Sequence, residues 1–257
     1  MLIDSEYVIE TANLNVYYGE LKILDNINIR IPRNVVFAIM GPSGSGKSTL
    51  LRTFNKLILL NPDARIKGVV KLFGKNIYNP GYDYTEISKV VGIVFQTPNP
   101  FPHLSIYDNV ALGLKLNGII KSRNEMERRV QEALEKVGLW DEVKGKLKMP
   151  STELSIGQKQ RLCIARTLAL KPKVILMDEP TSSLDPSNTR KIEDLIMELK
   201  REATVIIVTH SPAQAYRISD YVAFLFSGRL IEVGPTKELF ENPSQKLLKD
   251  FLRGGYG

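Results

Sequence analysis

The sequence predicts an α/β protein in which a mostly parallel β-sheet is covered by helices on both faces. Short apolar runs of strand length alternate with longer segments whose apolar residues recur at helical spacing. A glycine-rich loop over residues 41–49 separates the apolar run 35–40 from the helical segment 50–57. Ligands of such sheets bind where the strands end at their carboxyl side. Four apolar runs are followed by polar residues, which predicts a ligand site formed by residues 43–49, 96, 178–179 and 210.

The N-terminal half predicts two kinds of sheet. Residues 7–33 alternate apolar and polar side chains, a pattern typical of half-buried antiparallel strands. The run 35–40 is continuously apolar, which favours a strand buried on both faces, and further strands are predicted at 69–73 and 90–95. Three prolines between 98 and 102 then break regular structure, and residues 103–150 predict an inserted group of helices with Gly138 as a C-terminal cap.

The C-terminal half repeats the alternation of helix and strand. Helices are predicted at 155–170 and from an N-cap near Ser187 to residue 199, with strands at 174–177 and 205–208. The pair Ser227-Gly228 predicts a tight turn between strands 222–226 and 229–233.

Bulk composition narrows the class of protein. With 257 residues, 43% hydrophobic and 25% charged, the chain has the make-up of a globular protein. The net charge of +7 permits a polyanionic partner, but the basic residues are scattered and favour a solvated surface. The single cysteine, Cys163, excludes an intrachain disulfide, and with only two histidines a zinc site is not expected. No apolar run approaches membrane-spanning length, and the start lacks signal-peptide features. If the protein acts at a membrane, we therefore expect it to dock on another chain.

The loop at 41–49 fits the P-loop pattern of Gly, four residues, and Gly-Lys-Ser. Glycines let the backbone curl with its N–H groups pointing inward, and the following helix adds its positive dipole end, so the loop is suited to phosphate. The lysine places a cation on the β- and γ-phosphates, and the serine offers a hydroxyl to Mg²⁺. The sequence therefore predicts a nucleoside-triphosphate site made of Gly41, Pro42, Ser43, Gly44, Ser45, Gly46, Lys47, Ser48 and Thr49.

Two carboxylates end the apolar strand 174–177. Asp178 stands where Mg²⁺ on the β- and γ-oxygens needs an anchor, and the neighbouring Glu179 is suited to polarising the attacking water. Alone, Asp-Glu-Pro would be an ordinary exit from a strand. Downstream of a P-loop, the pair predicts a hydrolytic site.

Three further signals are Leu154-Ser155-Ile156-Gly157-Gln158 at the start of a helix, Ser183-Leu184-Asp185, and His210 at the end of a strand. With these, nearly the whole chain resembles the ATP-binding-cassette (ABC) ATPases, with every motif in the family's order. Within them it is most similar to the phosphate-import (Pst-type) subunits. That similarity is carried by residues 95–102, 105–110, 139–144, 161–166, 234–236 and 240–243.

The resemblance implies a role for each matching residue. The loop 41–49 is the Walker A loop and Asp178 the Walker B carboxylate. Glu179 is the catalytic base, His210 the switch histidine, and Gln96 the Q-loop glutamine that senses Mg²⁺ and water. The implied catalytic residues are thus Glu179, His210, Gln96 and Lys47, and the implied Mg²⁺ ligands are Ser48, Gln96 and Asp178. Further nucleotide contacts are implied for Tyr18, which stacks on the base, and for Ser155, Gly157, Gln158 and Asp185.

The resemblance also implies an architecture and partners. The whole chain, 1–257, would be one ABC ATPase domain of the P-loop NTPase (RecA-like) class, with an antiparallel β subdomain at 1–35, a core at 36–97 and 168–257, and a helical subdomain at 98–167. Two copies would bind ATP head to tail, with Ser155, Gly157 and Gln158 facing the partner's nucleotide. The dimer would sit on the cytoplasmic face of the cell membrane against two transmembrane permease subunits. These would receive phosphate from an extracytoplasmic binding protein, and no nucleic acid is implied.

One residue departs from the family pattern. The signature usually reads Leu-Ser-Gly-Gly-Gln, and Ile156 replaces its first glycine. Because isoleucine is strained at positive φ, we expect ordinary helical or extended backbone there, and activity to survive.

Three other interpretations remain open at the level of sequence. The same machine could import another anion or an amino acid, which the genes of its permease would reveal. A non-transport ABC ATPase acting on nucleic acid would fit the positive charge, but such proteins typically carry two cassettes or a long coiled coil. A P-loop kinase or GTPase would leave the signature and His210 unexplained, and no Asn-Lys-x-Asp motif is present.

Overall fold

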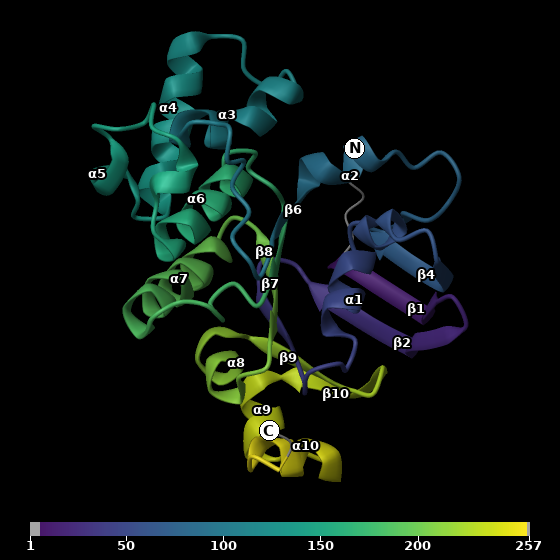
Figure 1. Ribbon diagram of the computed structural model, residues 1–257. Coiled ribbons are helices and arrows are strands. Elements are labelled where there is room, and N and C mark those ends of the chain that lie inside the picture. The colour runs from purple at the N-terminus through teal and green to yellow at the C-terminus, as the bar shows by residue number, and fades with distance from the viewer. Residues whose placement is uncertain (1–5, 256–257) are drawn as a thin grey trace. The chain divides into compact units, whose positions relative to one another are not determined.

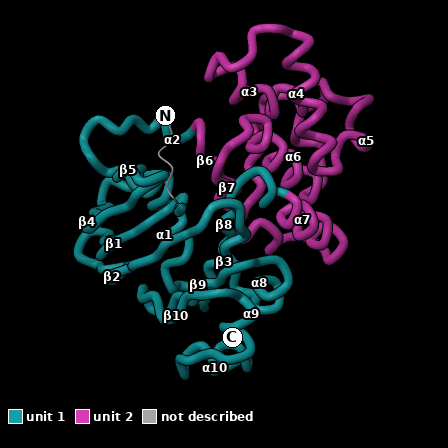
Figure 2. The backbone as a smooth tube through the Cα atoms, turned by 180° about the vertical axis from the view of Figure 1, so that it is seen from behind, with its two compact units in different colours: residues 1–88, 199–257 teal, residues 89–198 magenta. Residues whose placement is uncertain are grey.

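The computed structural model describes residues 6–255. The chain divides into two compact units, residues 1–88 with 199–257, and residues 89–198 (Figure 2). No helix within 6–255 is both long enough and apolar enough to cross a membrane.

The first unit contains a twisted antiparallel sheet (Figure 1). Its order is β2-β1-β4-β5, and its strands are β1 (Tyr7–Tyr18), β2 (Leu21–Pro32), β4 (Ala64–Leu72) and β5 (Lys75–Asn76). The alternation in 7–33 therefore forms two long strands. A third long strand, β4, pairs with β1 although it lies outside the range 1–35 predicted for this sheet. That pairing joins residues 46 (Tyr18 and Ala64) to 63 (Ile9 and Leu72) positions apart, and no local pattern encodes it.

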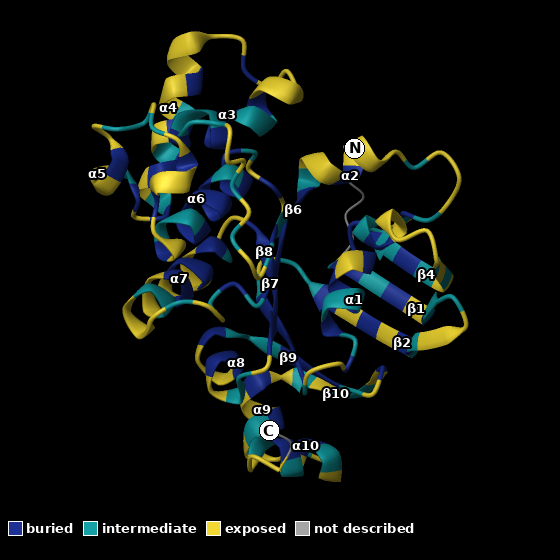
Figure 3. Cartoon of the chain, in the orientation of Figure 1, coloured by how far each residue is buried: buried dark blue, intermediate teal, exposed yellow. Residues whose placement is uncertain are grey.

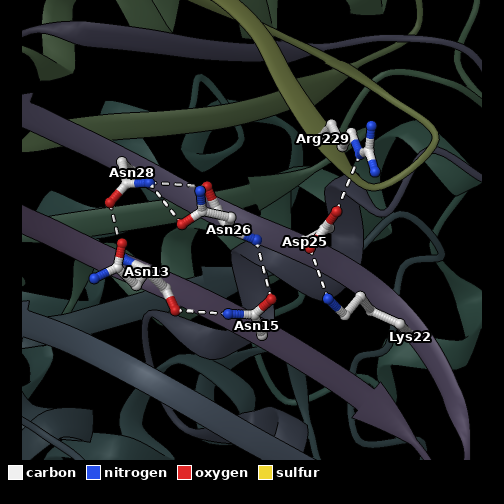
Figure 4. Close-up of polar contacts among 7 residues, drawn as sticks. All are labelled: Asn13, Asn15, Lys22, Asp25, Asn26, Asn28 and Arg229. Atoms are coloured by element: carbon white, nitrogen blue, oxygen red, sulfur yellow. Dashed lines mark hydrogen bonds and ion pairs between the residues drawn. The ribbon is translucent and has the colours of Figure 1, made fainter.

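Bulges in β1 and β2 are stabilised by asparagines (Figure 4). Asn13 and Asn26 take positive φ angles of 49° and 53°, which asparagine tolerates better than most residues. The Asn28 carboxamide accepts from the backbone N–H of Asn13, and the Asn15 carboxamide accepts from that of Asn26. Side chains thus replace ladder bonds that the bulges interrupt.

The first unit also contains parallel strands. β3 (Val36–Met40) lies between β8 (Thr204–Thr209) and β9 (Tyr221–Phe226) and runs parallel to both. Every residue of β3 and β8 is buried, as the continuous apolar runs predict. The predicted hairpin is confirmed: β10 (Arg229–Pro235) pairs antiparallel with β9 through Ser227-Gly228, whose positive φ angles suit a type I′ turn.

Short helices complete this unit. They are α1 (Lys47–Thr53), a 3₁₀ turn (Leu57–Leu60), α8 (Pro212–Ile218), α9 (Thr236–Glu241) and α10 (Lys246–Leu252). The helix predicted to reach residue 57 ends at Thr53, and the left-handed conformation of Lys56, with φ of 63°, is incompatible with a helix that continues through it.

The second unit is mostly helical around two parallel strands, β6 (Val91–Val94) and β7 (Val174–Asp178). Its helices are α3 (Ile106–Leu116), α4 (Arg123–Lys136), α5 (Trp140–Val143), α6 (Ile156–Leu168) and α7 (Pro186–Leu199), and α2 (Tyr84–Val90) leads into the unit. Helix α6 packs on α3 and α4, whose inner sides are buried and outer sides exposed (Figure 3). Gly138 has φ of 63° and follows the last turn of α4.

Candidate nucleotide-binding site

The loop after β3 owes its shape to glycines. Gly41 has φ of 155°, and a Cβ there would lie 2.0 Å from the carbonyl oxygen of Leu225. Gly46 has φ of 95°, and a Cβ there would lie 2.7 Å from Leu24 Cδ2. Gly44 is also left-handed, with open space around it. Only glycine meets these backbone and steric demands together, and the result is a tight loop of the kind that turns backbone N–H groups toward an anion.

Lys47 lies inside this loop. It is the first residue of α1 and only 5% exposed. Its ammonium donates hydrogen bonds of 2.9 Å to the carbonyl oxygens of Gly41 and Pro42. The hydroxyl of Ser45 is buried without a hydrogen-bond partner among the described residues. A buried cation and an unsatisfied hydroxyl within one glycine loop fit a polar, anionic ligand.

His210 leaves the sheet beside the P-loop. Met40 and Thr209 are paired in the parallel ladder of β3 and β8, so Gly41 and His210 are the residues that follow at two neighbouring strand ends. His210 is exposed. The structure therefore brings together the start of the P-loop and His210, two parts of the predicted site.

Tyr18 is the last residue of β1 and is half-buried. It pairs with Leu21 across the turn and with Ala64 of β4. The P-loop packs against the next strand, since a Cβ on Gly46 would approach the Ile23 carbonyl oxygen to 3.3 Å. Tyr18 therefore lies in the β1–β2 hairpin, whose second strand packs against the P-loop.

In the second unit, β7 ends in the two predicted carboxylates. Asp178 is 4% exposed at the strand's last position. Glu179 has φ of 45°, a left-handed conformation that costs a residue with a side chain about 1–3 kcal/mol. This backbone is not extended, so β7 ends at Asp178 and Glu179 lies outside the strand.

Gln96 reaches Glu179. It lies two residues beyond the end of β6, and its Nε2 is 3.4 Å from Glu179 Oε2. Val94 pairs with Met177, so the two polar residues follow neighbouring parallel strands at nearly equal register. The predicted convergence of these two strand ends is present within the second unit.

Gln160 is a residue that the sequence analysis missed. It lies on α6, is 1% exposed, and its Nε2 donates to the carbonyl oxygens of Phe95 and Pro180 at 3.1 and 3.0 Å. It thereby joins the backbone next to Gln96 to the backbone next to Glu179. The sequence contained one indication of this role: helical spacing places the polar Gln160 on the same face as the buried positions 157, 161 and 164.

The signature segment caps α6. Ser155 Oγ accepts from the Gln158 N–H at 3.3 Å, and Gln158 Oε1 accepts from the Ser155 N–H at 3.0 Å, forming a capping box. Ile156 is the first helical residue, is 57% exposed and has no positive φ, so the prediction of ordinary backbone is confirmed. A Cβ on Gly157 would lie 2.9 Å from Asn188 Nδ2, so this glycine lets α7 approach closely.

Asp185 begins α7. Its carboxylate accepts from the N–H groups of Ser187 and Asn188 at 2.9 and 3.0 Å. The prediction of an N-cap near Ser187 is therefore corrected to Asp185, because a carboxylate two residues earlier satisfies the free amides. The Asn188 side chain and backbone hydrogen bonds lower the pKa of Asp185.

Comparison with known proteins identifies the family. The sequence model of the ABC transporter family matches residues 24–182, more than half of the chain. The chain belongs to the ABC transporter family. The resemblance seen in the motifs is confirmed.

Curated relatives of this ABC protein match it over almost their full length. A protein of Thermococcus kodakarensis named phosphate import ATP-binding protein PstB is 59% identical over 98% of this chain and 99% of its own. Proteins of the same name from Pyrococcus furiosus and Thermotoga maritima are 58% and 50% identical, again over 98% of this chain. The similarity to Pst-type subunits is thus confirmed.

Solved ABC structures share its fold. CbiO1 from Clostridium perfringens, part of an ABC transporter complex, covers 97% of this chain with a TM-score of 0.79 and 32% identity. A dimeric structure of the ATP-binding cassette MJ0796 bound to ADP and Pi covers 89% with a TM-score of 0.76 and 31% identity. The predicted α/β class, with parallel strands, an antiparallel sheet and added helices, is confirmed.

Proposed function

We propose that this ABC protein is the ATP-hydrolysing subunit of an importer that carries inorganic phosphate across the cytoplasmic membrane. The observation that carries the ATPase part is the glycine loop curled around the buried Lys47 ammonium. The phosphate part rests on the full-length relatives named phosphate import ATP-binding proteins.

The nucleotide phosphates lie, in this proposal, against the N–H groups of residues 41–49 and the ammonium of Lys47. Support comes from the Lys47 ammonium, which donates to the carbonyl oxygens of Gly41 and Pro42 and would donate to a phosphate instead when one is bound. Tyr18 stacks on the base.

Mg²⁺ is assigned to Ser48, Asp178 and Gln96. No group of three or more His, Cys, Asp or Glu side chains within residues 6–255 could hold a metal ion. Asp178 is the one carboxylate among the three assigned ligands, and Mg²⁺ is commonly held by one or two carboxylates together with substrate phosphates and water. When bound, the ion neutralises charge on the β- and γ-oxygens.

Hydrolysis is assigned to Glu179 as general base, with Gln96 and His210 orienting the water. A base must lie within hydrogen-bond reach of its water and be held in a fixed direction. The left-handed backbone of Glu179 and its contact to Gln96 supply such a direction. Lys47 stabilises charge on the transferred phosphoryl group.

Two copies act as a head-to-tail dimer in this proposal. Ser155, Gly157 and Gln158 of each copy face the nucleotide of the other, and Asp185 lines the same contact. Support comes from the 13-residue helix α6, whose N-terminal amides favour anions, and from the dimeric ADP-bound relative.

The dimer is placed on the cytoplasmic face of the membrane, bound to two transmembrane permease subunits. Residues 96–110 are assigned to transmit motion to them, and phosphate reaches the permease from an extracytoplasmic binding protein that this chain does not contact. Nucleic acid has no role in this scheme.

The test is uptake of radioactive phosphate by cells with the gene deleted and then restored. We expect deletion to lower uptake at low external phosphate, the intact gene to restore it, and Glu179→Gln to fail. Unchanged phosphate uptake together with lost molybdate or amino-acid uptake would show that the cargo is different. A purified protein without ATPase activity would contradict the catalytic part.

A further inference from the structure

The short helix α5 is joined to α6 by a pair of charged side chains. Arg161 Nη1 lies 2.8 Å from Glu142 Oε1, and Nη2 lies 3.2 Å from Oε2. This is a bidentate pair, the geometry that fixes both the distance and the plane of the two groups. It connects the second turn of α6 to α5.

Glu142 also holds the residue that completes the cap of α6. Gln158 Nε2 donates to Glu142 Oε2 at 2.8 Å, while Gln158 Oε1 accepts from the Ser155 N–H. Both ends of the Gln158 carboxamide are therefore occupied, one by α5 and the other by the N-cap. A displacement of Glu142 would pass directly to the backbone of Ser155.

Arg161 extends the connection to α4. It is 4% exposed, and Nη1 also donates to the carbonyl oxygen of Gly138 at 2.6 Å. Its Nε is buried without a partner among the described residues, so the two Nη groups carry its interactions there. A buried guanidinium needs a counter-charge, and Glu142 supplies it. The hydrogen bond from Arg161 lowers the pKa of Glu142, so its carboxylate stays charged at neutral pH.

We propose that Glu142 is a positioning residue for the signature segment: it fixes Gln158 and Arg161, and so sets the direction in which Ser155 and the start of α6 face. This inference rests on the proposed function, in which that segment closes on the partner's nucleotide. In this proposal Glu142 acts through Gln158 and Arg161 and not on the nucleotide directly. Its effect falls on the joining of two protomers and leaves the P-loop of each protomer as it is.

The experiment measures ATPase rate against protein concentration, and separately the affinity of dilute protein for a fluorescent ATP analogue. For Glu142→Gln we expect the protein concentration giving half-maximal specific activity to rise about tenfold, the size of effect when a charge-assisted hydrogen bond is weakened. The rate at saturating protein should stay within about twofold, and analogue affinity should not change. The matched control is Asp141→Asn, which removes a charge from the same helix where the carboxylate pairs with Lys144.

A second variant separates positioning from folding. Glu142→Gln alone leaves the Arg161 cation buried without its counter-charge, which destabilises a fold. Glu142→Gln with Arg161→Met removes both charges, so we expect thermal stability closer to that of the wild type but a half-activation concentration that stays raised.

Three results would overturn the inference. The first is a half-activation concentration in Glu142→Gln equal to that of the wild type. The second is a half-activation concentration in the double variant that returns to the wild-type value. The third is a loss of affinity for the fluorescent ATP analogue in Glu142→Gln as large as the rise in its half-activation concentration. A wild-type protein that hydrolyses no ATP would instead contradict the proposed function, and this inference would fall with it.

Discussion

Glu179 combines an unfavourable backbone conformation with a side chain that the proposed chemistry requires. Glycine or asparagine would adopt the left-handed φ of 45° with less strain than glutamate does. The glutamate at this position therefore lowers the stability of the fold. The contact to Gln96 Nε2 at 3.4 Å is long enough to tighten when a ligand arrives. The P-loop glycines show the opposite case, in which the residue type removes the strain.

Glu179→Gln should retain ATP binding and lose nearly all turnover, by at least about a hundredfold, because the carboxamide cannot accept a proton from water. ATP should then trap the dimer. The checks are phosphate release and size-exclusion chromatography with ATP. Retained hydrolysis would mean that another group is the base.

Gly41→Ala should destabilise the protein more than Gly44→Ala. Both alanines would carry the backbone cost of positive φ, about 1–2 kcal/mol, but only the first would place a Cβ 2.0 Å from the Leu225 carbonyl oxygen. Urea unfolding of the two variants measures the difference. Equal losses would show that the loop can move away from β9 without cost.

At the scale of elements, α6 organises the second unit. Its N-terminus is fixed by the capping box and by Glu142, and its buried face carries Gln160 to the loops after β6 and β7. One helix therefore begins at Ser155 and bonds the residues next to Gln96 and Glu179. Glycine at position 157 lets α7 pack close enough for Asn188 to lie against it.

Gln160→Leu should lower the maximal ATPase rate and the stability together. It leaves the carbonyl oxygens of Phe95 and Pro180 without their donor, at about 1–3 kcal/mol for each buried group. Gln131→Leu is the control, since that glutamine is exposed on α4 and bonds Glu135. A rate unchanged in Gln160→Leu despite lower stability would show that the two loops keep their positions without it.

At the scale of the whole molecule, stability should depend on pH through paired carboxylates. Asp108 accepts hydrogen bonds from Lys115 and Ser105 at 2.7 and 2.6 Å, and these lower its pKa. Its carboxylate is therefore more acidic in the folded state than in the unfolded chain. Such a group stabilises the fold above its unfolded pKa, and that stabilisation disappears as pH falls through the folded pKa. Asp25, Glu142 and Asp185 have lowered pKa values as well.

Asp108→Asn should therefore lower the melting temperature at pH 7, and the difference from the wild type should shrink below about pH 4, where the unfolded carboxyl group titrates. Thermal unfolding followed by circular dichroism over a pH series measures it. A difference that stays constant across the series would mean that the carboxylate's charge is not what stabilises α3.

The sequence alone determined the family, the α/β class and the identities of the residues proposed to bind and hydrolyse ATP. These follow from local patterns, because strand length, helical spacing and the order strand, glycine loop, helix are all encoded by neighbouring residues. Even the ordinary helical backbone at Ile156 was predictable, since side-chain branching restricts φ locally. The N-cap of α7 was predicted near Ser187, two residues after its position at Asp185. Helix boundaries predicted from sequence are commonly in error by this amount.

Only the tertiary structure decided that β4 pairs with β1, that Gln160 joins two loops, and that Glu142 anchors the signature segment through Gln158 and Arg161. Each of these links residues that are 16 to 65 or so positions apart in the chain. Their hydrogen bonds exist only after the elements have packed, so no window of sequence contains the information. In the sequence, Gln160, Glu142 and Arg161 have the residue types of solvated surface side chains. Only the folded structure shows which of them are buried, and a buried polar group needs a hydrogen-bond partner.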